Sequence, residues 1–239
     1  MNDLGLDKSL QRGDKDGQVK LIQEWLSLHG EHVGIDGDFG PATQSAVKDF
    51  QNKVGLPSTG IVDANTFEQL IAPMRAALQP IPANSRSLRD LVVAYAQQHL
   101  VQHPREVGGQ NMGPWVRLYM NGKEGIPWAW CAGFVCFCLK KACETLGEQL
   151  PIRPSFSVDE LATSAKQKGR FVAQNEAGAG SFFLVRKSPT DWTHIGIVVS
   201  TAAESFRTIE GNTNDDGSRE GYEVCARSRA YGKTDFILI

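Results

Sequence analysis

The sequence predicts an all-α module of three helices followed by an α+β domain with an antiparallel sheet, and three observations support this fold class. Residues 10–71 carry apolar side chains at helical spacing, interrupted by glycine-rich turns. Residues 73–86 contain three prolines, which favour an extended connector over a continuing helix. From residue 87 onward, helical patterns come first and strand-like runs follow, which is the order typical of an α+β domain.

The composition is that of a globular protein with two domains. The 239 residues are 41% hydrophobic and 22% charged, which argues against a disordered or fibrous chain. Residues 1–72 carry 6 basic and 11 acidic side chains, whereas the remainder carries 19 and 16, a split that suits two parts with separate tasks. The net charge of −2 argues against nucleic acid as the main partner. No apolar run approaches the roughly 20 residues of a membrane span.

Each helix of the first module is predicted from its own local signals. Residues 19–26 place apolar side chains at helical spacing in the first helix. Pro41 is suited to the first turn of the second helix, and Asp63 is suited to cap the third. Residues 34–43 and 60–66 echo one another weakly, since each leads from a glycine through a turn into a helix. The module contains no catalytic constellation, so we expect it to bind rather than to catalyse.

Cys131 stands out among the five cysteines. An odd number excludes a complete internal disulfide framework, and no C-x-x-C spacing supports structural zinc. An apolar helix is predicted to begin near Trp130 and to end at Gly147. Cys131 therefore lies in its first turn, where the helix dipole and unpaired backbone amides favour the thiolate and can hold an oxyanion. The remaining cysteines are expected to be small buried hydrophobic residues: Cys136, Cys138, Cys143 and Cys225.

His194 is the histidine best placed to act as a base. It begins a predicted strand in which alternation puts His194 and Gly196 on one face, and the glycine leaves space there for a substrate or a partner. The next predicted strand carries Glu210 and Asn212 two residues apart, hence on one face. A hairpin turn within residues 201–205 sets His194 opposite one of these two side chains.

Cys131, His194 and either Glu210 or Asn212 can therefore supply a nucleophile, a base and a group that orients the base. These three roles are what nucleophilic catalysis by a cysteine requires. The alternative is that Glu210 and Asn212 are merely turn and edge residues of the sheet.

Residues 10–71 resemble the three-helix peptidoglycan-binding domain, and the match is dense and nearly continuous. The resemblance implies that residues 1–72 bind peptidoglycan and that residues 73–86 form a proline-containing linker. It rests on stretches 19–23 with Leu26, 36–43, 46–47, 50–51, 55–56, and 60–63 with Thr66.

Residues 87–239 resemble the CHAP group of cysteine, histidine-dependent amidohydrolases and peptidases, within the papain-like cell-wall hydrolases. The matching stretches are residues 130–135, 194–198 and 209–213, in that order along the chain. The resemblance implies a papain-like α+β domain. It also implies the catalytic residues Cys131 as nucleophile, His194 as base, and Glu210 and Asn212 as orienting groups.

Two positions depart from the pattern of that family. Thr193 replaces a glycine common before the histidine, and we expect it to tighten the approach to the imidazole. Ser181 replaces an aspartate at the first strand, and we expect only a turn to change. Some members bind calcium upstream of the cysteine, but residues 121–127 offer one carboxylate, too few for the roughly six to eight oxygen ligands of calcium. We predict no metal and no other cofactor.

The two resemblances imply a peptidoglycan hydrolase similar to phage endolysins that cuts an amide bond in or next to the stem peptide. N-acetylmuramoyl-L-alanine amidases and peptidoglycan endopeptidases share this machinery, so the sequence does not decide which amide bond is cleaved. A bacterial autolysin and a secreted effector are alternatives to a phage endolysin. The alternatives are a non-catalytic wall-binding protein with an inactive papain-like domain, or a wall acyltransferase.

The N-terminus points to the site of synthesis. The first residues are acidic where a secretory signal needs a basic start and an apolar core. We therefore expect cytoplasmic synthesis without a signal peptide, and action on the cell wall after release. The expected form is a monomer that does not insert into a membrane.

Overall fold

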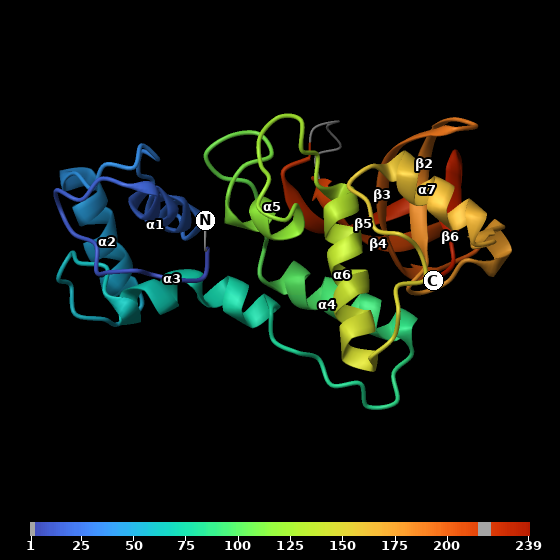
Figure 1. Ribbon diagram of the computed structural model, residues 1–239, viewed down its shortest axis with the longest axis horizontal. Coiled ribbons are helices and arrows are strands. Elements are labelled where there is room, and N and C mark those ends of the chain that lie inside the picture. The colour runs from blue at the N-terminus through green and yellow to red at the C-terminus, as the bar shows by residue number, and fades with distance from the viewer. Residues whose placement is uncertain (1–2, 215–220) are drawn as a thin grey trace.

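The computed structural model describes residues 3–214 and 221–239. A helical N-terminal part lies at one end of the molecule and a domain of helices and sheet lies at the other (Figure 1). Within the described residues, no helix combines the length and the apolar character that crossing a bilayer requires.

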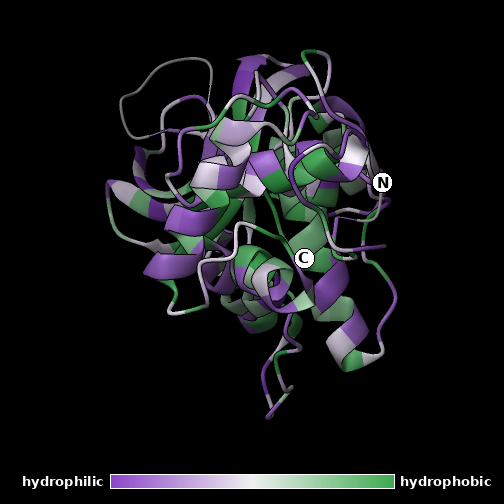
Figure 2. Ribbon diagram, turned by 90° about the vertical axis from the view of Figure 1, so that its left-hand side faces the viewer, coloured by the Kyte–Doolittle hydropathy of each residue, from purple (hydrophilic) through white to green (hydrophobic). Residues whose placement is uncertain are grey.

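Three helices form the N-terminal part, as predicted. They are α1 (Gly17–Leu28), α2 (Pro41–Lys53) and α3 (Ala64–Ala77). Asp16 caps α1 by accepting two backbone N–H groups, Asp63 caps α3, and Pro41 occupies the first turn of α2. Green and purple turns alternate on the helices in Figure 2, as expected for amphipathic helices that bury one face.

Two buried glutamines hold equivalent turns of the N-terminal part. Gln23 donates to the Thr43 hydroxyl (3.1 Å) and accepts from the backbone N–H groups of residues 36–37. Gln51 donates to the Thr66 hydroxyl (3.0 Å) and accepts from a backbone N–H of the turn before it. Each glutamine thus joins a turn to the first residues of the next helix. The weak echo in the sequence is therefore a structural repeat.

The helix α3 continues through a proline. The three prolines predict that no helix continues into residues 73–86, and at Pro73 this is wrong, because α3 runs on to Ala77. A proline inside a helix costs about 3 kcal/mol. The burial of Met74 and Ala77 opposes that cost, and so does the Gln98 side chain, which donates to the Ala77 carbonyl at 2.8 Å. The extended segment predicted by the other two prolines follows α3.

The second domain has the predicted α+β fold with an antiparallel sheet. Within the described part of this domain, six strands are hydrogen-bonded in the order β1-β6-β2-β3-β4-β5, and each neighbouring pair is antiparallel. The two-residue strand β1 carries too few residues to show alternation and was not predicted. The elements are α4 (Leu88–Val101), α5 (Pro114–Tyr119), α6 (Cys131–Leu146), α7 (Val158–Gln167), β1 (Phe171–Val172), η1 (Gln174–Glu176), β2 (Phe182–Ser188), β3 (Asp191–Thr201), β4 (Ser205–Thr213), β5 (Glu223–Ala230) and β6 (Thr234–Ile237).

Both faces of the sheet carry apolar side chains. Ile195 and Ile197 belong to the large core that the helices share, whereas Phe183 and Val198 belong to a smaller cluster. The helix α6 packs against α4, β3 and β4. Its first residue therefore meets the two strands that carry the predicted base and orienting groups.

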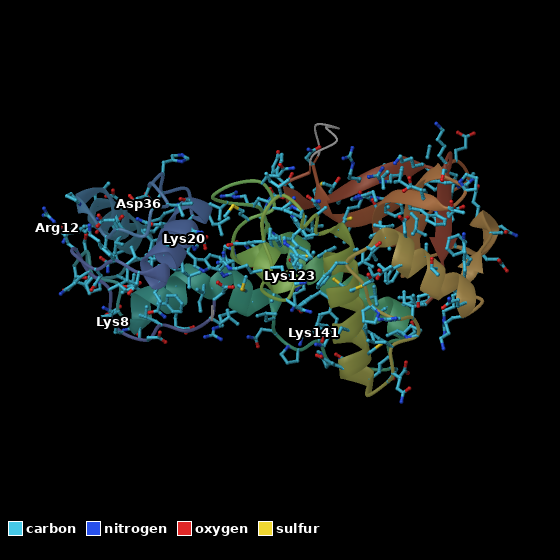
Figure 3. The ribbon with its side chains drawn as sticks, turned by 45° about the horizontal axis from the view of Figure 1, so that its top comes forward. Lys8, Arg12, Lys20, Asp36, Lys123 and Lys141 are labelled. Atoms are coloured by element: carbon cyan, nitrogen blue, oxygen red, sulfur yellow. The ribbon has the colours of Figure 1, made fainter. Side chains whose placement is uncertain are left out.

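A buried ionic cluster joins the two parts of the molecule. Arg117 of α5 is 7% exposed and pairs with Glu24 of α1, which is 1% exposed, at 2.7 Å. The same guanidinium pairs with Asp3 at 2.8 Å and with Glu124 at 2.7 Å. Lys20 lies on the side of α1 nearest the second domain (Figure 3), with its ammonium 3.8 Å from a Glu24 oxygen. The N-terminal part is thus packed directly on the second domain.

Candidate functional site

Cys131 is the first residue of α6, so it lies in the first turn of this helix, as predicted. Trp130 precedes it as the N-terminal flanking residue, and no side chain caps this end of the helix. The unpaired backbone amides and the positive end of the helix dipole therefore face the thiol. Cys131 is 5% exposed and lines a cavity of about 620 Å³.

The environment of Cys131 favours its thiolate. Burial opposes ionisation, but a hydrogen bond from His194, the charge of its ring, and the backbone amides of Ile195 and Ala132 bring the pKa of Cys131 below its usual value. Deeper in α6 the direction reverses. Burial raises the pKa of Cys136 to about 11, and it raises the pKa of Cys138 further.

His194 lies between the thiol and a carboxylate. Its Nε2 is 2.8 Å from Oε2 of Glu210, which leaves Nδ1 as the ring nitrogen that can interact with Cys131. The side chain is 16% exposed. Burial lowers the pKa of His194, but hydrogen bonds and opposite charge from Cys131 and Glu210 outweigh it and raise the pKa to about 9.

Glu210 is fully buried, and Arg229 and Thr208 donate hydrogen bonds to it in addition to His194. Arg229 donates from Nε to Oε1 at 2.6 Å and from Nη2 to Oε2 at 2.5 Å, a bidentate pair. The Thr208 hydroxyl donates to Oε1 at 2.5 Å. Burial would raise the pKa of Glu210, but Arg229 and His194 hold it at about 2. Glu210 is therefore ionised at neutral pH.

Arg229 and Thr208 are not among the site residues expected from the sequence. A signal for both was present, because alternation in the last long strand places Arg227 and Arg229 on one face, and Thr208 shares a face with Glu210. Without the strand register, nothing in the sequence singles out Glu210 as their shared partner.

Asn212 occupies a different place from Glu210. It lies where the pairing of β4 with β5 shifts register, with φ of +51°, and its side chain lines the cavity beside Cys131 and His194. Among the described residues, the hydrogen-bond partner of the imidazole from this strand is Glu210 and not Asn212. The structure thus brings Cys131, His194 and Glu210 into one chain of contacts and leaves Asn212 on the cavity wall.

Gly196 provides space, but the space is filled by protein. A Cβ at this position would lie 2.6 Å from a ring carbon of Phe183 and 2.8 Å from Cγ of Glu210. The expectation of space for a substrate or a partner is therefore wrong at this position, because the side chains of Phe183 and Glu210 fill it. Thr193, which replaces a glycine common in the family, is exposed and lines the cavity.

The described residues contain no cluster of three or more His, Cys, Asp or Glu side chains placed to hold a metal ion. The chemistry that these residues can supply is that of an activated thiolate beside an imidazolium. A buried carboxylate–arginine pair behind the imidazole fixes its orientation and its charge.

Comparison with known proteins identifies the N-terminal part. Residues 15–70 match the family described as "Putative peptidoglycan binding domain". The spore cortex-lytic enzyme of Bacillus cereus is 38% identical over 63 residues, which are 26% of this chain and 24% of that enzyme. The zinc D-Ala-D-Ala carboxypeptidase of Streptomyces albus G is 35% identical over 65 residues, 26% of each chain. The match thus spans about a quarter of the length of these curated relatives.

Two solved structures share parts of this chain. The N-terminal domain of SleB is 35% identical and covers 28% of this chain and 93% of its own, with a TM-score of 0.28. A Burkholderia AP3 phage endolysin is 27% identical and covers 45% of this chain and 41% of its own, with a TM-score of 0.26. The family match at residues 15–70 confirms the predicted module, and the N-terminal part of this chain is a peptidoglycan-binding domain.

Proposed function

We propose that this protein is a peptidoglycan hydrolase that cuts an amide bond in or next to the stem peptide, through a CHAP-like domain at residues 87–239. The observation that supports it best is the continuous chain of contacts from Cys131 through His194 to Glu210. In this proposal residues 1–72 bind the wall, residues 73–86 connect the domains, and no cofactor takes part. Two curated relatives also support the proposal, because one is named as a spore cortex-lytic enzyme and the other as a D-Ala-D-Ala carboxypeptidase.

In the first half of the proposed reaction, the Cys131 thiolate attacks the amide carbonyl carbon. Negative charge moves to the carbonyl oxygen, where the backbone amides at the start of α6 can stabilise it. The His194 imidazolium then gives its proton to the leaving amine as the carbon–nitrogen bond breaks. The amine departs and the acyl group remains on sulfur as a thioester.

In the second half, the same imidazole works as a base. His194, now neutral, takes a proton from water while the water oxygen attacks the thioester carbonyl. The carbon–sulfur bond breaks, a carboxylic acid leaves, and the thiolate–imidazolium pair is restored. Glu210 is a positioning residue throughout, since it holds Nε2 and stabilises the charged ring.

Substitution at Cys131 tests this proposal. Cys131→Ala should abolish clearance of cell-wall suspensions and should leave sedimentation with sacculi unchanged, because residues 15–70 carry the binding domain. Cys143→Ala is the matched control and should keep the activity. Mass analysis of the digest identifies the new amine and carboxyl group, and hence the bond. Clearance by Cys131→Ala at the original rate would contradict the proposal, and incorporation of an added amine would indicate acyl transfer instead.

A further inference from the structure

The cavity beside Cys131 carries a cation that the proposed reaction does not use. Arg227 lies on β5 two residues before Arg229, on the same face, and both line the cavity together with Cys131 and His194. Glu210 neutralises Arg229 by a bidentate pair. Within the described residues, no Asp or Glu forms an ion pair with Arg227, and none lines this cavity.

The Arg227 guanidinium is held on one side and open on the other. Its Nη1 donates to the Thr213 hydroxyl at 3.2 Å and to the carbonyl of Asn214, which anchors the group to the end of β4. In the part of the chain that the structure describes, Nε and Nη2 donate no hydrogen bond. These two nitrogens form the planar edge that matches the two oxygens of a carboxylate.

The neighbours of Arg227 favour an anion over a neutral group. Glu210, which contacts the neighbouring Arg229, already accepts two bonds from Arg229, one from Thr208 and one from His194. The remaining polar groups of the cavity include the amides of Gln110, Asn111 and Asn212, none of which carries charge. A ligand carboxylate is therefore the group that would satisfy the open edge of Arg227.

We infer that Arg227 binds a carboxylate of the substrate close to the amide that Cys131 attacks, and that it makes the enzyme select peptides with a free carboxylate there. The inference rests on the proposed function, since it places the carboxylate in the same cavity as the thiolate. A carboxylate is the anion that a peptide carries on its side chains and at its C-terminus. Arg227 is thus a specificity residue and takes no part in the transfer of the acyl group.

The test compares soluble stem peptides whose carboxyl groups are converted one at a time to carboxamides. The full chain should cleave the peptide with the recognised carboxylate about 10- to 100-fold better, in kcat/KM, than its carboxamide counterpart, the range for one charged hydrogen-bonded pair. Arg227→Gln should lose that preference by slowing only the carboxylate peptide, chiefly through KM. Arg227→Lys should keep part of it. Arg207→Gln, on the exposed side of β4, is the matched control and should behave as the unaltered chain.

A binding measurement separates this inference from the proposed function. In the Cys131→Ala background, the carboxylate peptide should bind about 10- to 100-fold more tightly than the carboxamide peptide, and Arg227→Gln should remove the difference. The inference is wrong if Arg227→Gln cleaves or binds both peptides with the original preference, or loses both equally. Absence of cleavage by the unaltered chain, with peptide selectivity in binding retained, would contradict the proposed function and leave the Arg227 subsite supported.

Discussion

Two clusters of this protein pair an arginine with carboxylates, but they lie in different surroundings. At the site, Arg229 pairs with the fully buried Glu210, which in turn contacts His194. Between the two parts of the molecule, Arg117 pairs with Glu24, Asp3 and Glu124. The first cluster ends in an imidazole that faces a cavity, whereas the second consists of one guanidinium and three carboxyl groups.

The difference shows what each cluster can do. Arg229 keeps Glu210 ionised behind His194, and Cys131 together with Glu210 raises the pKa of the imidazole, whose hydrogen bond and charge in turn favour the thiolate of Cys131. Arg117 bonds to Glu24, which lies 93 residues earlier in the sequence, and to Asp3, which lies 114 residues earlier. A buried ion pair adds little over a well-packed apolar replacement, but removal of one partner leaves an uncompensated charge. One cluster adjusts protonation and the other fixes the relative position of two domains.

The largest expected effect concerns the domain interface. Arg117→Ala leaves the buried Glu24 with only the more distant Lys20 ammonium, at 3.8 Å, so the free energy of unfolding should fall by about 3–5 kcal/mol, measured by urea denaturation. Lys187→Ala, which breaks an exposed pair with Asp191, is the control and should cost about 0–1 kcal/mol. A loss for Arg117→Ala as small as that of the control would mean that the interface cluster contributes nothing to stability.

The next effect concerns the charge behind His194. Glu210→Gln keeps the shape of the side chain but removes one of the two charges, those of Cys131 and Glu210, that raise the pKa of His194 to about 9. The pKa should fall, so the alkaline limb of the pH–rate profile should move to lower pH, and kcat should drop about 100-fold. Asn212→Ala is the comparison, because the Asn212 side chain lines the cavity without touching the imidazole, and it should lower the rate a few-fold. If Asn212→Ala shifts the alkaline limb of the pH–rate profile and Glu210→Gln does not, then Asn212 rather than Glu210 is the residue that raises the pKa of His194.

The smallest expected effect concerns Arg229. Arg229→Gln should leave Glu210 bonded to Thr208 and His194, so the carboxylate keeps its place but loses its bidentate cation. The pKa of Glu210 should rise from about 2, and activity should be lost on the acid side at a higher pH than in the unaltered protein. We expect the rate at neutral pH to fall about tenfold, consistent with the loss of one charged hydrogen-bonded pair. An unchanged acid limb would show that Thr208 and His194 suffice to keep Glu210 ionised.

Local patterns predicted much of this molecule. The alternation of side chains along a strand places His194 and Glu210 on the same face of a hairpin. Helix start signals predict that Cys131 lies at the beginning of α6. Two features had no local signal. The Arg117 cluster depends on side chains more than ninety residues apart, and the helix around Pro73 depends on packing against a second domain.

If His194 keeps Cys131 as a thiolate, the pH dependence of Cys131 alkylation should show it. Iodoacetamide is added over a range of pH, and peptide mass spectrometry follows Cys131 separately from the other cysteines. The rate of Cys131 alkylation should reach half its maximum at a pH below the value of about 8.5 for a free thiol, and His194→Ala should move that midpoint upward. A midpoint at or above the free-thiol value, unchanged by His194→Ala, would show that His194 does not keep Cys131 as a thiolate.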